Sequence, residues 1–188
     1  MGEKTPIPGT RLGMTSRMTE LALTISPEKP ADAEAVERLH ERTFGPGRYA
    51  RTAYRIREGR GHLLSLSFVA RIGTLLVGSV RLTPIRIGRA KALLLGPLTV
   101  EPPFRSRGIG RALIERALAD AKAQGHRLVL LVGDAPFYAR AGFGPVPKGK
   151  VAMPGPVDPG RLLVHELVSG AFDGVAGTVK PDWERLPA

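Results

Sequence analysis

The sequence predicts an α/β fold of the α+β kind, with a central mixed, mostly antiparallel sheet of six to seven strands. Three apolar stretches between residues 63 and 100 are separated only by short turns, which is typical of antiparallel strands in a meander. The next stretch, residues 108–124, has apolar residues at helical spacing, and a buried strand at 128–132 follows it. A strand, a helix and a strand within about forty residues predict a βαβ unit, whose two strands are parallel.

The N-terminal part of the chain predicts one strand and one helix behind an irregular leader. Residues 1–20 combine Gly, Pro, Thr and Ser without periodicity, so we expect a disordered leader, with Met18 as an alternative start of the chain. The segment Leu21–Ile25 alternates in the manner of a short strand. Pro30 opens a helical pattern that Gly45 ends.

The next elements are a second helix and the three strands of the meander. The segment Arg51–Gly59 predicts a short helix rich in arginine. The strands and their turns follow from alternating apolar runs broken by glycine. We expect these strands at Leu63–Ile72, Leu75–Ile87 and Ala92–Val100.

The C-terminal part predicts a short helix and two last strands. Pro136–Ala141 is helical and ends at a glycine, and the strands lie near Lys150–Met153 and Leu162–Leu167. Beyond Val168 we find mostly polar and glycine-containing sequence. The expected organisation is therefore one domain over 21–168 and a C-terminal tail over 169–188.

Composition excludes several classes of site. The 188 residues include no cysteine, so disulfides, thiolate metal ligands and cysteine nucleophiles are absent, and the four histidines lack metal-ligand spacing, so no metal is expected. No apolar run is long enough for a membrane span and residues 1–17 do not resemble a secretory signal, which makes the cytoplasm the expected location. A net charge of +11 favours an anionic partner, whether a phosphorylated cofactor, nucleic acid or an acidic protein surface.

The segment Arg105–Arg111 is the most informative motif. It joins a strand to a helix, and the first turn of a helix binds phosphate through its unpaired N–H groups and partial positive charge. Gly108 and Gly110 would let a phosphate approach the backbone, and the arginines could pair with its oxygens. A tight turn with solvated arginines remains the alternative. A dinucleotide-binding fingerprint and a P-loop are excluded, because Leu113 replaces the third glycine and no Gly-Lys-Ser/Thr follows.

Four elements in this order resemble one family. They are the strand Leu98-Thr99-Val100, the motif Arg105-x-x-Gly108-x-Gly110, the run Val132-Gly133-Asp134, and Phe137-Tyr138-x-x-x-Gly142-Phe143. Together they resemble the GNAT superfamily of acetyl-CoA-dependent N-acetyltransferases, and the third looks like its YhbS-type branch of mostly uncharacterised predicted acetyltransferases. The resemblance implies the GNAT fold, with helices on both faces of the sheet.

The resemblance also implies an activity and a site. The activity is transfer of an acetyl group from acetyl-CoA to a primary amine of a small molecule or protein, by direct attack in a ternary complex. The cofactor arm would pair with the strand at Leu98–Val100, which should splay from the strand at 128–132, with an interruption at Gly96–Pro97. The implied cofactor-binding residues are Leu98, Thr99, Val100, Arg105, Arg107, Gly108, Ile109, Gly110 and Arg111.

The resemblance implies a candidate for the general acid of the reaction but not for the general base. Tyr138 resembles the family tyrosine that protonates the leaving thiolate, although its ring could instead only pack the small helix. Phe137 and Phe143 are expected in the core. The strand Ala92–Val100 carries no carboxylate, so the general base stays open among ordered water, Asp134, His165 and Glu166, while Glu101 is expected to be solvated.

The acceptor and the partners are the least defined features. We expect an acceptor pocket between the first two helices and the loop before the last strand. Four arginines would make this pocket basic, so it would favour an anionic acceptor. The alternative is that these arginines form a solvated helical face. Two other functions remain, a non-catalytic acyl-CoA sensor and an acetyltransferase of a ribosomal or nucleic-acid-associated protein. Direct nucleic-acid binding is not expected, because no recognition motif is present, whereas a homodimer is possible. The four arginines are Arg48, Arg51, Arg55 and Arg57.

Overall fold

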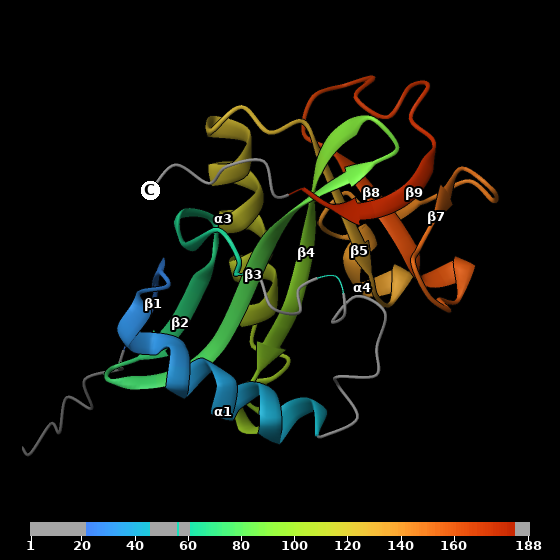
Figure 1. Cartoon of the computed structure of the whole chain (residues 1–188). Helices are drawn as coiled ribbons and strands as arrows, with labels where there is room; N and C mark the ends of the chain where they lie inside the picture. The colour runs from blue at the N-terminus through green and yellow to red at the C-terminus, as the bar shows by residue number, and fades with distance from the viewer. Residues whose placement is uncertain (1–21, 46–55, 57–60, 183–188) are drawn as a thin grey trace, which may run out of the picture.

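A computed structural model describes residues 22–45, 56 and 61–182, and its centre is one twisted sheet (Figure 1). Seven strands follow one another across the sheet in the order β1-β2-β3-β4-β5-β8-β6, while β9 pairs with β3 and β7. The strands are β1 (Leu23–Pro27), β2 (Phe68–Ile72), β3 (Leu75–Ile87), β4 (Ala90–Val100), β5 (Leu128–Val132), β6 (Gly144–Pro145), β7 (Val151–Ala152), β8 (Leu162–Glu166) and β9 (Gly177–Pro181).

The strand directions confirm the predicted mixed, mostly antiparallel sheet. Along the seven-strand path only β4 and β5 run parallel, with Leu93 opposite Val129 and Leu94 opposite Leu130. They are the two strands of the predicted βαβ unit. A second parallel pair joins β7 to β9. The strand predicted to begin at Leu63 begins at Phe68, because Leu64–Leu66 forms a 3-10 turn.

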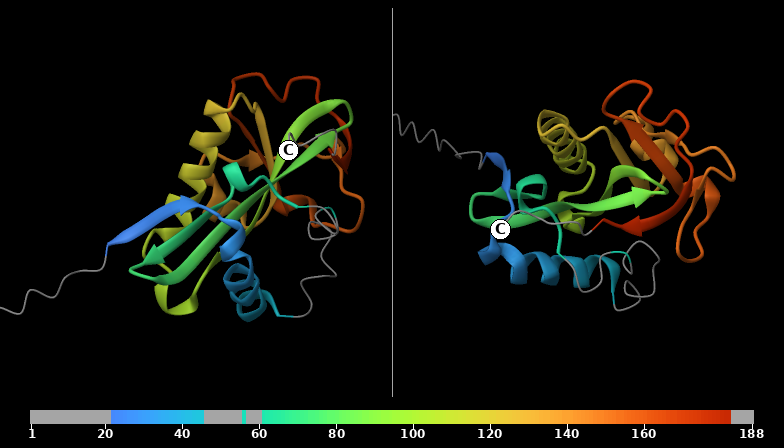
Figure 2. Two further views of the ribbon diagram at one scale, coloured as in Figure 1. Left: turned by 60° about the vertical axis from the view of Figure 1, so that its left-hand side comes forward. Right: turned by 45° about the horizontal axis from the view of Figure 1, so that its top comes forward.

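The helices cover both faces of the sheet, as predicted (Figure 2, right). They are α1 (Ala33–Phe44), α3 (Ile109–Ala123) and α4 (Ala135–Ala139). On α3 the buried side chains recur every three or four residues, which places them in one stripe against the sheet; they are Ile109, Leu113, Ile114, Ala117, Leu118 and Ala121. The predicted second helix, 51–59, lies outside the described residues except for Ile56.

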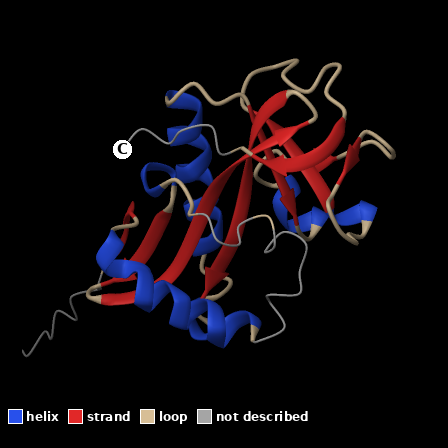
Figure 3. Cartoon of the chain, in the orientation of Figure 1, coloured by secondary structure: helices blue, strands red, loops and turns tan. Residues whose placement is uncertain are grey.

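The strands of the sheet are drawn in red in Figure 3. Successive side chains of a strand point to opposite faces, so the sheet separates two cores. On β4, Leu93 and Leu95 belong to the core under α3, whereas Ala92 and Leu94 belong to a second core with Val179 of β9. Thr99 of β4 is buried on the face of α1.

The prediction of a tail over 169–188 is wrong for residues 177–181. These residues form β9, which pairs with Ile85–Ile87 of β3, and Val179 is fully buried. A five-residue strand with one buried side chain has no readable apolar periodicity, which explains the error. The predicted leader, 1–20, and residues 183–188 lie outside the described residues.

Candidate functional site

The site begins where β4 and β5 separate. Their parallel pairing ends at Leu94 and Leu130, although β4 continues to Val100 and β5 to Val132. Opposite the cis peptide Gly96–Pro97 the register between β3 and β4 shifts, which confirms the interruption predicted from that proline. The two strands therefore leave an opening at their carboxyl ends, which we call the β4–β5 opening.

One edge of β4 faces this opening with its backbone polar groups. The N–H of Glu101 donates to Val77 O of β3 at 2.8 Å, so every second residue of β4 at this end bonds toward β3. The residues between, Leu98 and Val100, consequently direct their N–H and C=O groups toward the opening. No strand of the described part of the chain pairs with them there. This edge can accept an extended ligand as an added strand.

The N-terminus of α3 lies next to this edge and has unpaired amides. The first helical bond runs from Ala112 N–H to Gly108 O at 2.9 Å, so the N–H groups of residues 109–111 have no acceptor within the helix. Gly108 precedes the helix at φ 78°, and Ser106 at φ 60° is a non-glycine residue in the left-handed region. A Cβ at Gly108 would meet no atom within 4 Å, so the space beside this glycine at the start of the helix is open. This arrangement suits a phosphate.

The three arginines of the motif are exposed, and each has a protein contact. Arg105 Nε donates to Val100 O at 3.1 Å, which ties the loop to the end of β4. The Arg107 guanidinium lies 5.6 Å from the centre of the Phe104 ring, and Arg111 Nε lies 2.6 Å from Glu115. Each contact leaves other guanidinium N–H groups able to bind an anion.

Gly110 is the point where three predicted elements meet. A Cβ built there would lie 3.5 Å from Phe137, 3.7 Å from Val100 and 3.8 Å from Leu98. The helix start, the end of β4 and α4 are therefore in contact around one small residue. The structure thus brings together the three motifs that the sequence separates by up to forty positions.

Tyr138 is held on α4 by aromatic contacts. Its half-buried ring meets Phe137 and Phe143 edge-to-face, at 4.9 and 5.9 Å between centroids. A Cβ at Gly133 would lie 2.2 Å from a Tyr138 ring carbon, so only glycine leaves room for the ring directly after β5. Phe143 is buried as predicted, but the prediction that Phe137 is in the core is wrong, because it packs on Gly110 with 42% of its surface exposed.

The candidate bases are placed differently from one another. Asp134 is exposed and begins α4. The Nδ1 atom of His165 lies 2.8 Å from Gly142 O, and Glu166 pairs with Leu128 at the far end of β5 from the opening. Glu101 was expected to be solvated, but it forms an ion pair with Arg42 and its side chain is only 17% exposed.

A buried polar chain on the α1 face of β4 was missed from the sequence. His40 Nε2 of α1 lies 3.1 Å from Ser79 Oγ of β3, which lies 2.8 Å from Thr99 Oγ1 of β4. All three side chains are at most 1% exposed. A readable signal existed, because polar residues at 79, 81 and 83 alternate with apolar ones along β3.

A buried ion pair lies next to this chain. Arg81 of β3 donates to both carboxylate oxygens of Glu28, and to Glu37 of α1 at 2.7 Å. Burial alone would raise the pKa of Glu28. His62, whose Nε2 lies 3.2 Å from the carboxylate, and the hydrogen bonds and charge of Arg81 outweigh that effect and lower the pKa from 4.5 to about 2.

A small cavity of about 130 Å³ lies beyond the opening, in the loop before the last strands. Its lining is mainly apolar and includes Leu162, which pairs with Val132 at the carboxyl end of β5. The four arginines expected near an acceptor, Arg48, Arg51, Arg55 and Arg57, lie outside the described residues. Within the described ranges, no helix is long and apolar enough to cross a membrane, and no group of three metal-ligating side chains occurs.

Comparison with known proteins finds similarity to GNAT acetyltransferases. A family model for an acetyltransferase (GNAT) domain matches residues 64–145. The uncharacterized N-acetyltransferase YhbS of Escherichia coli (strain K12) is 27% identical over 160 residues, which cover 84% of this chain and 95% of that protein.

Solved structures agree with this match. The crystal structure of YhbS from Escherichia coli in complex with CoA has a TM-score of 0.75 at 26% identity, and covers 89% of this chain and 94% of that chain. A GNAT family acetyltransferase from Brucella melitensis in complex with acetyl-CoA has a TM-score of 0.56 at 29% identity, with 81% and 99% covered. The opening beside β4, the unpaired amides of α3 and these matches agree with one another: the chain has the GNAT fold and is similar over most of its length to GNAT N-acetyltransferases such as YhbS.

Proposed function

We propose that the protein transfers an acetyl group from acetyl-CoA to a primary amine by direct attack in a ternary complex. The observation that carries this proposal is the edge of β4 at Leu98 and Val100, with which no strand of the described residues pairs, directly beside the N-terminus of α3. An acyl-CoA combines an extended amide-containing arm with a pyrophosphate, so it matches both features at once. The relatives crystallised with CoA and acetyl-CoA support the same ligand.

The pyrophosphate would bind the amides of residues 107–111, with Arg105 and Arg107 adding positive charge. The arm would lie along Leu98–Val100 as an added strand, and its thioester would come next to the Leu98 N–H. That N–H would stabilise the oxyanion that forms when the amine attacks the carbonyl carbon.

The remaining steps are proton transfers. The neutral amine attacks the thioester, the C–S bond breaks, and the thiolate takes a proton from the Tyr138 hydroxyl. Tyr138 later regains its proton from the general base of the reaction. Tyr138 is supported by its place against Gly133, at the β5 side of the opening. The proton of the attacking amine must leave by another route, since β4 carries no carboxylate.

The direct test has two arms. Calorimetry measures the binding of acetyl-CoA, and free thiol release is followed with a panel of amines that includes amino acids, polyamines, aminoglycosides and peptides with free N-termini. We expect tight binding and acetylation of at least one amine. Binding without turnover of any amine would favour the acyl-CoA sensor, and absence of binding would refute the site.

A further inference from the structure

The buried chain between α1 and β4 ends at the strand that carries the proposed acyl donor. Thr99 lies between Leu98 and Val100, and its side chain points to the opposite face from theirs, toward α1. Ser79 is its direct cross-strand neighbour on β3. The two hydroxyls and the His40 ring thus form a continuous path of short hydrogen bonds away from the opening.

The far end of the path gives it a direction. His40 Nδ1 lies 3.7 Å from Glu37 Oε1, too far for a hydrogen bond but close enough for the carboxylate to favour a proton on that nitrogen. With its proton on Nδ1, the ring accepts a hydrogen bond at Nε2 from Ser79, and Ser79 accepts one from Thr99. The lone pairs of Thr99 Oγ1 are then the receiving end.

We propose that Thr99, Ser79 and His40 form the proton relay that deprotonates the acceptor amine, with His40 as the terminal base. This rests on the proposed acetyl transfer. As the amine nitrogen bonds to the acetyl carbon, its proton passes to Thr99 Oγ1, directly or through one water molecule. The Thr99 proton moves to Ser79 Oγ, and the Ser79 proton moves to His40 Nε2.

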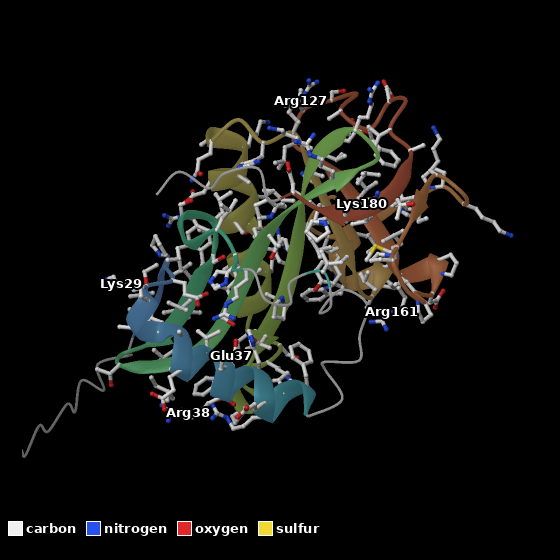
Figure 4. The ribbon with its side chains drawn as sticks, viewed as in Figure 1. Lys29, Glu37, Arg38, Arg127, Arg161 and Lys180 are labelled. Carbon is white, nitrogen blue, oxygen red and sulfur yellow. The ribbon has the colours of Figure 1, made fainter. Side chains whose placement is uncertain are left out.

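The balance of the step is one proton lost by the amine and one gained by His40. The imidazolium forms beside the Glu37 carboxylate, which is 42% exposed and can pass the proton to solvent (Figure 4). His40 acts through two other side chains, so it is a positioning residue and not one that touches the substrate.

Among the described residues, charged side chains on several elements lie around His40. Glu37 lies on the same helix, Arg81 of β3 binds both Glu37 and Glu28, and the Arg42–Glu101 pair joins the end of α1 to the residue after β4. Because Arg81 shares the Glu37 carboxylate, that carboxylate is only partly available to pair with the imidazolium. A base that must also release its proton needs such a limit.

The test replaces single hydroxyls and follows kcat/KM against pH, with acetyl-CoA and the amine of the panel that gives the highest turnover. Thr99→Val keeps the side-chain shape and removes the relay, so we expect a loss of about 100-fold at pH 7. The activity of this variant should then rise with pH, because hydroxide can accept the proton that the relay no longer removes from the attacking amine. Thr99→Ser should restore both the rate and the wild-type profile.

Thr83→Val is the matched control, because Thr83 is also a buried threonine of the sheet and its hydroxyl has no hydrogen-bond partner among the described residues. It should leave the pH profile unchanged, and the acetyl-CoA Kd should stay the same in all three variants. A Thr99→Val enzyme with the wild-type profile would overturn the relay alone. If acetyl-CoA binds but no amine is acetylated, the transfer activity itself fails, and the relay fails with it.

Discussion

The two faces of β4 near its end differ in how far apart in the sequence their contacting residues lie. On the α3 face, Leu98 and Val100 meet Gly110, and every contact joins residues within one stretch of about forty positions. On the α1 face, Thr99 meets Ser79 and, through it, His40, so three separate elements have to be folded before the chain of hydrogen bonds exists. A ligand-binding loop can therefore be recognised as a motif, whereas a buried polar path depends on tertiary structure.

Gly110→Glu should produce the largest effect, and it acts on the α3 face alone. The new side chain would crowd Phe137, Val100 and Leu98 and place a negative charge where the pyrophosphate is proposed to bind. We expect acetyl-CoA affinity, measured by calorimetry, to fall by about 100-fold or more. Ala119→Glu adds the same charge at an exposed position of the same helix and should bind normally. Equal affinities in the two folded variants would refute the cofactor site.

Tyr138→Phe tests chemistry on the same face. The ring should still pack between Phe137 and Phe143, so kcat should fall by about 100-fold while KM for acetyl-CoA changes little. Gly133→Ala should give a similar loss with the hydroxyl retained, because its methyl group would displace the ring. If Tyr138→Phe only lowers the melting temperature and keeps kcat, the tyrosine is structural.

Acid should weaken the α1 face through Glu28. The pKa of this carboxylate is lowered in the folded protein to about 2, so its contribution is complete above the unfolded value of 4.5 and is lost as the pH falls toward 2. We expect the free energy of unfolding in urea to drop by about 2 kcal/mol between pH 6 and pH 3 from this group. Glu28→Gln should be less stable at pH 6 and show a smaller drop. Parallel curves for the two proteins would contradict the assignment.

The smallest expected change comes from the loop arginines. Arg107→Ala should weaken CoA binding by about tenfold, because a charged hydrogen bond contributes about 1.5–3 kcal/mol. A loss confined to CoA and absent with dephospho-CoA would place Arg107 at the 3′-phosphate, and equal losses would place it at the pyrophosphate. Arg116→Ala, from a pair with Asp120 farther along α3, is the control. Unchanged binding of both ligands would show that Arg107 is only solvated and stacked on Phe104.

The sequence predicts the site unevenly, for physical reasons. The strand–helix–strand unit, the interruption at Pro97 and the phosphate-binding start of α3 depend on local periodicity, on proline and on glycine, and all can be read along the chain. The position of Phe137 depends on whether α4 leaves space above Gly110. The local sequence pattern does not predict this packing. His40 reads as one residue of an amphipathic helix until Ser79 is known to lie beneath it.

The strand β9 covers part of one edge of β3. β2 pairs with the first half of β3, from Leu75 to Val80, and β9 pairs with the same edge farther along, at Ile85–Ile87. A chain shortened before residue 177 would expose this edge as a row of unpaired backbone groups between two isoleucines, which is a template for pairing with another copy. We therefore expect β9 to reduce aggregation, although it lies away from the β4–β5 opening.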